Sequence, residues 1–280
     1  MGNGLNISVV KLHSFTAVAP LDTGFRGAKL SAESHSSTGL HARASGARLN
    51  KISTFLWLIL CISIVLGCQK QKPSEDMVIV PEGEFIIGSN IGAEDERPEK
   101  KIFLKAFHID KFEVSNDAYR QFIQETKHRE PKNWMAYGYK EEEKDYPVIF
   151  VDYNDALEYC KWRGKRLPTE EEWEKAARGI DGRIYPWGNE FKDSKANTSL
   201  SGIVGAIKTG MYEDGKSPYG LYDTAGNVWE WTASNYSENR KVVKGGSWGL
   251  SHRFARTFSR VGYKPDTRIN NLGFRCAKDA

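Results

Sequence analysis

The chain has 280 residues, of which 40% are hydrophobic and 12% aromatic, a composition typical of a globular protein. Its formal net charge is +4, but six of the 40 basic residues and two of the 36 acidic residues precede position 68, which leaves 34 of each sign. This balance excludes an extended basic surface for a nucleic-acid backbone, so we expect no nucleic-acid partner.

An unusual leader opens the chain. Residues 1–47 are rich in Ser, Gly, Ala and His and lack apolar periodicity. The basic residues Arg48 and Lys51 then precede an apolar run over 52–66, which is typical of an export signal. The run is shorter than the roughly 20 residues of a spanning helix. Because a leader before a signal peptide is odd, we expect segment 1–47 to be disordered, or not made because translation starts near Leu49.

The sequence V-L-G-C ends the apolar run and resembles the lipobox of bacterial lipoproteins. In such proteins the cysteine, here Cys68, is lipidated and becomes the new N-terminus. We therefore expect a signal peptide over 48–67, a polar tether over 68–76 and one domain over 77–279. The alternative is a plain N-terminal anchor.

A lipidated cysteine defines the first expected partner, a membrane, since several acyl chains on one residue hold a protein stably on a bilayer. Gln69 follows the cysteine and favours transfer to an outer membrane. The expected location is the bacterial cell envelope, at the outer membrane or the periplasmic face.

The first half of the domain predicts strands followed by helices. Apolar and polar residues alternate over 77–88 around a P-E-G turn, which predicts a hairpin, and again over 102–112, which predicts a strand region. Ser115 is placed to cap a helix over 116–126, and a second helix is expected over 154–163.

A third helix is expected between Thr169 and Gly179. Thr169 and Glu172 have the spacing of a capping box, and the buried stripe consists of Trp173, Ala176 and Ala177. We interpret the acidic triplet 170–172 as ordinary first-turn chemistry rather than as a catalytic group. Regular patterns fade after this helix.

The segment 220–232 reads G-L-Y-D-T-A-G-N-V-W-E-W-T and places Asp223, Asn227 and Glu230 among small residues and two tryptophans. Carboxylate, amide and carbonyl oxygens are the ligands that calcium takes in proteins. The pattern therefore predicts either a cation site or a solvated turn packed by Trp229 and Trp231.

Five motifs in order carry a family resemblance: G-K-R-L-P-T-E-E-E-W-E at 164–174, Y-P-W-G-N at 185–189, the segment 220–232, G-G-S-W at 245–248 and G-F-R-C at 273–276. Over residues 76–278 the chain resembles the sulfatase-modifying-factor, or formylglycine-generating-enzyme, family. The resemblance implies an irregular α+β fold of the C-type-lectin-like kind with little regular secondary structure. Some members oxidise a sulfatase cysteine to formylglycine with copper and oxygen.

The resemblance also implies a structural calcium ion. The family pattern D-x-x-G-x-V-x-E binds calcium through positions that here are Asp223, Gly226, Val228 and Glu230. A second family calcium site begins at a pair matching Asn197 and Thr198, although its later ligands have no clear match in this chain.

The copper site is where this sequence departs from the family. Oxidases of the family carry one cysteine three residues after the serine of G-G-S and another five residues later. Counting from Ser247, these positions are Leu250 and Ala255, and neither side chain can supply the thiolate that Cu(I) prefers. The sequence therefore argues against copper. We call residues 247–256, which contain these positions, the pocket segment. His252 is its one candidate for a replacement metal ligand, with an ordinary surface histidine as the alternative.

Two further implications concern the end of the chain. The family has a disulfide at the positions of Cys160 and Cys276, and an oxidising compartment permits it, with two buried free thiols as the alternative. Four arginines, Arg256, Arg260, Arg268 and Arg275, look like structural forks that pair with carboxylates and carbonyls, or else contact an anionic ligand.

The expected function is that of a membrane-anchored envelope lipoprotein whose domain has a binding or structural role, with an envelope protein or a glycan as partner. The alternative is an oxidoreductase of the same family that acts on a protein or small thiol with altered metal ligands. A third interpretation is lectin-like carbohydrate recognition through calcium.

Overall fold

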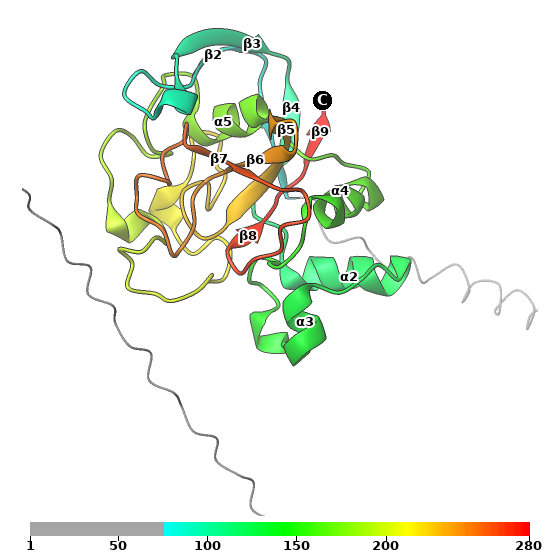
Figure 1. The fold of residues 1–280 in the computed structure, drawn as a ribbon. Helices are drawn as coiled ribbons and strands as arrows, with labels where there is room; N and C mark the ends of the chain where they lie inside the picture. The colour runs from blue at the N-terminus through cyan, green and yellow to red at the C-terminus, as the bar shows by residue number, and fades with distance from the viewer. Residues whose placement is uncertain (1–75) are drawn as a thin grey trace, which may run out of the picture. The chain divides into compact units, whose positions relative to one another are not determined.

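The computed structural model describes residues 76–280 (Figure 1). The expected leader 1–47, signal peptide 48–67, lipidated Cys68 and the tether up to residue 75 lie outside the described residues. Within 76–280, no helix is both long and apolar enough to cross a membrane.

Three small sheets form the framework of the described chain. The first holds three antiparallel strands, β1 (Met77–Val80), β4 (Phe107–Asp110) and β9 (Ala277–Asp279). The second pairs β2 (Gly83–Ile87) with β3 (Lys100–Leu104). The third has the order β7 (Arg260–Tyr263), β6 (Arg240–Lys244), β5 (Trp229–Ser237) and β8 (Leu272–Gly273), with β5 and β8 parallel. Both ends of the described chain therefore meet in one sheet, beside β4.

The predicted hairpin over 77–88 is wrong, because β1 and β2 lie in different sheets. Strand β1 pairs with β4, from Met77 opposite Asp110 to Val80 opposite Phe107. The hairpin of this region instead joins β2 to β3 across a loop that contains the 3-10 helix η1 (Glu94–Glu96). Alternating side chains identify a strand but not its partner, and the partner of β1 lies beyond the next two strands in sequence.

Four α-helices and three further 3-10 turns complete the elements. The α-helices are α2 (Asn116–Thr126), α3 (Lys132–Tyr137), α4 (Tyr153–Trp162) and α5 (Glu170–Arg178), and the 3-10 turns are η2 (Glu141–Glu143), η3 (Asp193–Lys195) and η4 (Glu213–Gly215). No α-helix or strand occurs between the end of α5 and the start of β5. This long irregular stretch confirms the predicted α+β fold with little regular structure.

The predicted helix caps are confirmed. The Ser115 hydroxyl accepts a hydrogen bond from the N–H of Ala118 (3.3 Å) at the start of α2. At the start of α5, Thr169 and Glu172 form a reciprocal capping box, and Gly179 ends the helix with φ 74°. These short-range signals succeed because all of the atoms involved lie within one helical turn.

Two apolar clusters fix the helices on the sheets. The larger cluster packs α2, α3 and α4 against the four-stranded sheet and includes Tyr119, Phe122, Tyr159, Trp231 and Phe274. The smaller cluster packs α5 against the three-stranded sheet through Val80, Phe107, Ile109, Ala176, Leu221 and Ala277. The central segment 220–232 lies where these two clusters meet, since it contributes side chains to both.

A disulfide joins Cys160 in α4 to Cys276 just before β9, as predicted, with a Cα–Cα distance of 5.7 Å and both residues buried. The two cysteines are 116 residues apart. A crosslink that closes so long a loop restricts the unfolded chain strongly.

Replacing both cysteines with alanine is expected to lower the free energy of unfolding by about 3–5 kcal/mol. Urea unfolding followed by tryptophan fluorescence measures the loss. Wild-type protein in excess reductant serves as the control and is expected to lose a similar amount. An unchanged unfolding midpoint in the double variant contradicts the expectation.

Candidate functional site

The central segment is built from tight turns that end in strand β5. Asp223 and Asn227 both have φ 57° and Gly226 has φ 85°, so three of five successive residues have left-handed backbone. An added Cβ at Gly226 meets the carbonyl oxygen of Asn197 at 2.2 Å, so only glycine fits there. These turns bring the side chains of Asp223, Asn227 and Glu230 into the interior.

Glu230, one of the predicted calcium ligands, is fully buried in an ion pair with Arg275. The two arms of Arg275 donate to the two carboxylate oxygens, Nε to Oε2 at 2.6 Å and Nη2 to Oε1 at 2.7 Å. The indole N–H of Trp173 donates to Oε2 as well, at 2.7 Å. The carboxylate therefore accepts three hydrogen bonds and connects β5, α5 and the G-F-R-C segment.

Arg275 also donates hydrogen bonds to backbone carbonyls. Its Nη1 donates to the carbonyls of Asp110 and Lys111 (both 3.2 Å), and its Nη2 donates to that of Tyr222 (2.8 Å). One fully buried side chain thus joins the end of β4, the central segment and β5. The structural-fork interpretation is confirmed for this residue.

A second buried carboxylate, Glu113, lies beside the central segment and was missed by the sequence reasoning. It accepts hydrogen bonds from the side-chain amide of Asn227 (2.6 Å) and from the N–H of Val228 (3.2 Å). Burial and, to a smaller extent, repulsion from Asp223 and Glu230 raise the pKa of Glu113 well above its ordinary value. The signal in the sequence is slight, a single acid between Phe112 and Val114.

Asp223 completes this acidic group. Burial raises its pKa to about 6, against the N–H of Gly210, which donates to Oδ2 at 2.7 Å, and the charge of Arg275. Repulsion from Glu230 contributes to this rise. Three buried carboxylates thus face a single arginine, and this excess of negative charge is the kind that a cation relieves.

The predicted ligands of the calcium site are compatible with that role in their donor types. Oε1 of Glu230 accepts one hydrogen bond, from Arg275, and keeps a lone pair, and Asp223 accepts its hydrogen bond from Gly210 through Oδ2. Outside the strands, no backbone hydrogen bond of the described chain ends on the carbonyls of Gly226 or Val228. No group of three or more His, Cys, Asp or Glu side chains in residues 76–280 is placed to hold a metal. An ion here therefore depends on the two carbonyls.

Asn197 and Thr198, the predicted start of a second calcium site, take part in an interior hydrogen-bond network. The Asn197 amide donates to the Gly205 carbonyl (3.0 Å), and its Oδ1 accepts from the Ser201 hydroxyl (2.9 Å). The Thr198 hydroxyl accepts from the N–H of Leu200 (3.3 Å). Both side chains hold the loop that follows them, and the second calcium site stays a prediction.

The pocket segment after G-G-S holds the two positions that carry thiolates in the oxidases. Leu250 is half-buried and packs against the larger core cluster. Ala255 is buried against Ala196 and Ala225. Ser247 is buried nearby, where its hydroxyl accepts a hydrogen bond from the Asn271 amide (3.0 Å). Apolar contacts thus occupy both positions.

His252, the replacement candidate, is half-buried and stacks on the ring of Phe191, with ring centroids 4.9 Å apart. It belongs to no potential metal group within residues 76–280. His252 contacts Phe191, whereas Ser247 contacts Asn271. Its surroundings are those of an aromatic packing residue.

The other C-terminal arginines also act as forks. Nη2 of Arg256 donates to both oxygens of Glu96 (3.2 and 3.1 Å), and Arg260 contacts Glu170 at 2.9 Å. Arg268 donates to the carbonyls of Phe150 and Glu130 (both 2.8 Å).

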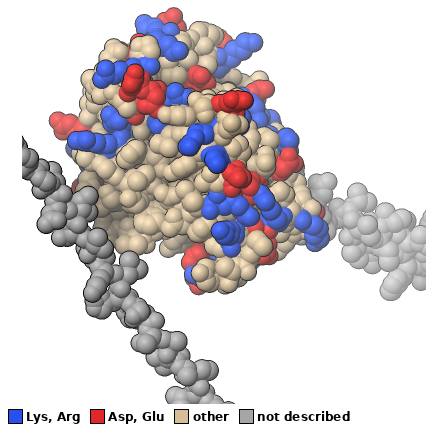
Figure 2. All heavy atoms as spheres, in the orientation of Figure 1, with Lys and Arg blue, Asp and Glu red and all other residues tan. Residues whose placement is uncertain are grey.

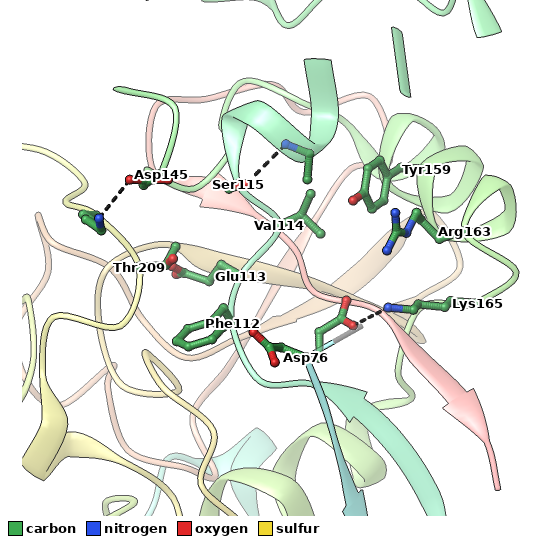
Figure 3. A pocket seen from close by; sticks show the side chains of 13 residues that line it. Asp76, Phe112, Glu113, Val114, Ser115, Asp145, Tyr159, Arg163, Lys165 and Thr209 are labelled. Carbon is green, nitrogen blue, oxygen red and sulfur yellow. Dashed lines mark hydrogen bonds and ion pairs between the residues drawn. The ribbon is translucent and has the colours of Figure 1, made fainter. Parts of the chain in front are cut away.

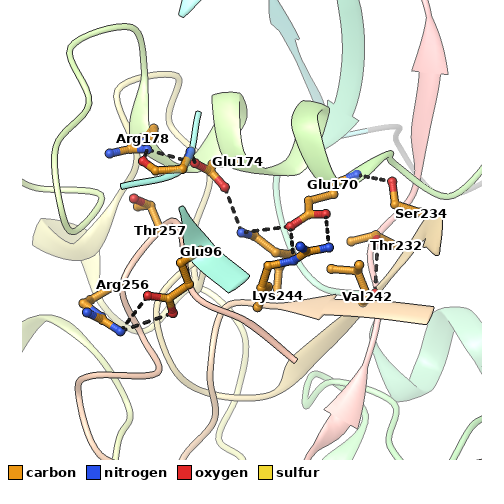
Figure 4. Close-up of polar contacts among 12 residues, drawn as sticks. Glu96, Glu170, Glu174, Arg178, Thr232, Ser234, Val242, Lys244, Arg256 and Thr257 are labelled. Carbon is orange, nitrogen blue, oxygen red and sulfur yellow. Dashed lines mark hydrogen bonds and ion pairs between the residues drawn. The ribbon is translucent and has the colours of Figure 1, made fainter. Parts of the chain in front are cut away.

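Behind these pairs lies a buried chain of charges (Figure 4). Lys244, which is fully buried, donates to Glu174 (2.9 Å) and lies 3.8 Å from Glu170. Glu174 in turn accepts from Arg178 (2.8 Å). The acidic triplet 170–172 therefore does more than stabilise the first turn of α5, because Glu170 also belongs to this network.

A separate cavity of about 280 Å³ borders the acidic group through Glu113 (Figure 3). On its opposite wall, Lys165 donates to Asp110 at 2.7 Å, and both side chains are largely buried. Burial raises the pKa of Asp110, while Lys165 opposes the shift. Asp76 and Thr209 also line the cavity, which places the start of the described chain beside the loop before the central segment.

Comparison with known proteins assigns the chain to a family. The sequence pattern of the family described as sulfatase-modifying factor enzyme 1-like domain matches residues 64–280. The chain belongs to this family. The family resemblance predicted from the five motifs is thereby confirmed.

Two relatives of this sulfatase-modifying-factor domain bear informative names. The Inactive C-alpha-formylglycine-generating enzyme 2 of Mus musculus is 35% identical over 285 residues, which cover 80% of this chain and 92% of the relative. The Formylglycine-generating enzyme of Streptomyces coelicolor is 29% identical over 289 residues, covering 75% of this chain and 91% of the relative.

Among solved structures, PvdO from Pseudomonas aeruginosa has the same fold, with a TM-score of 0.62 and 24% sequence identity over 73% of this chain and 94% of that chain. At this identity the similarity concerns the fold alone. It agrees with the predicted α+β class.

Replacing Arg275 with methionine is expected to destabilise the sulfatase-modifying-factor domain by about 3–5 kcal/mol, because it leaves the Glu230 carboxylate buried without its counter-charge. Urea unfolding measures the loss. Adding Glu230→Gln to this variant is expected to recover part of it. Lys161→Met, which breaks an exposed pair with Glu158, is the control and is expected to change little. If the losses in free energy of unfolding from Arg275→Met and Glu230→Gln simply add in the double variant, the two side chains are not coupled and the expectation is contradicted.

Proposed function

We propose that this protein is a lipid-anchored envelope protein whose sulfatase-modifying-factor domain has a binding or structural role and does not act as a copper oxidase. The observation that carries the proposal is the pair Leu250 and Ala255 at the two thiolate positions. Cu(I) is held by soft sulfur ligands, and these side chains offer none.

The surroundings of the two positions support this proposal. Leu250 and Ala255 take part in apolar packing, and the two cysteines of the described chain are joined in a disulfide. A relative at 35% identity is itself named an inactive formylglycine-generating enzyme. The same scaffold thus occurs in a relative whose name denies the activity.

The site residues give less support to two other functions. An oxidoreductase with altered metal ligands depends on His252, which stacks on Phe191. Lectin-like recognition requires calcium coordination sites that a sugar can reach, but Asp223 and Glu230 are both buried. The contacts of these residues favour the binding or structural role, toward an envelope protein or a glycan.

The wild-type protein is expected to bind no Cu(I) in competition with a chromogenic Cu(I) chelator and to consume no oxygen with a cysteine-containing peptide. The double variant Leu250→Cys/Ala255→Cys is expected to gain roughly hundredfold or more in Cu(I) affinity, because two thiolates then occupy the ligand positions.

Each single cysteine variant is the matched control for this experiment, since one thiolate cannot complete the pair. Oxygen turnover by the wild-type protein refutes the proposed absence of oxidase activity. Failure of the double variant to bind Cu(I) shows instead that the scaffold around Ser247 has changed beyond the two substitutions.

We further propose that calcium is a structural ion of the domain, held by the side chains of Asp223 and Glu230 and the carbonyls of Gly226 and Val228. The excess of buried negative charge and the free carbonyls support this assignment. Calcium in such a site crosslinks the turns of the central segment and compensates its carboxylates.

Asp223→Asn tests the ion, because the amide oxygen can still accept the hydrogen bond from Gly210 while the charge is removed. In calcium the variant is expected to melt several degrees below wild type, roughly the effect of 1–2 kcal/mol in a domain of this size. In chelator it is expected to melt no lower than wild type, since burial disfavours the Asp223 charge. Differential scanning calorimetry measures both.

Asp214→Asn changes an exposed carboxylate in the same loop region and is the control. Calcium is expected to raise its melting temperature as much as that of wild type. If calcium also raises the melting temperature of Asp223→Asn by the wild-type amount, the proposed ion at Asp223 is refuted.

A further inference from the structure

A short apolar tip projects from the loop before the central segment. It reads G-I-V-G over 202–205, and its two glycines have φ 73° and 124°. Val204 is 91% exposed and Ile203 is 42% exposed. Turn tips in water ordinarily carry Gly, Pro, Asn, Asp or Ser, so two adjacent β-branched apolar residues are unusual at this place.

The base of the tip is held rigidly. The Asn197 amide donates to the carbonyl of Gly205 (3.0 Å), and the Ser201 hydroxyl donates to Asn197 (2.9 Å). On the far side, Asn227 accepts from the N–H of Ile207 (3.0 Å). The tip is therefore presented in a fixed position by the same residues that shape the central segment, and little ordering is required when it binds.

The composition around the tip favours a lipid surface. Residues 194–212 contain no Asp or Glu but two lysines, Lys195 and Lys208, of which Lys208 is ion-paired with Asp145 (2.8 Å), and they expose Leu200 and Met211 as well. The molecular face in Figure 2 has a broad area without charged side chains at its lower left. An exposed apolar tip in a segment without acidic residues suits the boundary between acyl chains and anionic headgroups.

The residues that follow the tip lie near the start of the described chain. Asp76, the first described residue, and Lys208 and Thr209, which follow the tip, line the same cavity (Figure 3). Cys68 precedes Asp76 by eight residues, a length of chain that reaches at most about 29 Å. A lipid on Cys68 therefore keeps Asp76 within this distance of the bilayer surface.

We propose that Ile203 and Val204 insert into the surface of the bilayer that holds Cys68, as a second membrane contact that fixes the orientation of the domain. This inference rests on the proposed lipid anchor. Two contacts, the lipid and the tip, stop the domain from turning freely on its tether and leave the pocket segment 247–256 in a defined orientation to the membrane.

The chain contains a matched control for the tip. The sequence G-I-D-G over 179–182 also places an exposed isoleucine between two glycines, both with φ 74°. Ile180 is 64% exposed, but its neighbour is Asp181, which is ion-paired with Arg183. Both turns thus expose an apolar residue between two glycines, and they differ in charge.

The test uses the mature lipoprotein, in which Cys68 is lipidated and Cys160 and Cys276 are joined, so an added cysteine is the free thiol. Val204→Cys and Ile180→Cys are each labelled with a nitrobenzoxadiazole dye and reconstituted into vesicles of phosphatidylethanolamine and phosphatidylglycerol. Quenching by aqueous iodide and by spin-labelled lipid is measured, and intact mass reports the lipid on Cys68.

With the lipid present, iodide is expected to quench the dye at position 204 roughly fivefold less than the dye at position 180, with a blue-shifted emission, because an inserted residue leaves water. Equal iodide quenching at both positions, with the lipid on Cys68 present, overturns the insertion and leaves the anchor in place. Absence of the lipid from the intact mass overturns the anchor and, with it, the inference.

Discussion

The buried ion pair between Glu230 and Arg275 is the interaction on which the rest of the domain depends. Removing two charges from water is costly, and the cost is offset by the hydrogen bonds that both side chains make. Arg275 supplies both arms to one carboxylate and reaches three backbone carbonyls, and Trp173 completes the acceptor set. Strands from two sheets, helix α5 and the central segment are thereby held in fixed positions relative to one another.

This arrangement separates the scaffold from the chemistry. The turns around Asp223 and Gly226, the disulfide between Cys160 and Cys276 and the fork of Arg275 lie in the interior and support the fold. The positions that decide oxidase activity lie elsewhere, in the segment after Ser247. A domain of this family can therefore lose its copper ligands and keep its fold, since neither Leu250 nor Ala255 takes part in the buried ion pairs.

Much of the fold could be predicted from the sequence, but only where the signal is local or where a family pattern carries it. The caps at Ser115 and Thr169 involve atoms within one turn, and the family, the α+β class and the disulfide follow from ordered motifs. The hairpin over 77–88 was wrong because a strand pattern does not specify its partner. The role of Glu113 was missed because its hydrogen bonds reach residues more than 110 positions away.

The sequence by itself determined the family, the positions of α2, α4 and α5 but not of α3, the absence of thiolates at positions 250 and 255, and the ligand types of the central segment. Only the tertiary structure decided what those residues contact. It paired Glu230 with Arg275, added Glu113 to the acidic group, and left Val204 exposed on a rigid tip. The physical reason is that burial and charge pairing depend on segments far apart in sequence, and their meeting is fixed by packing of the whole domain.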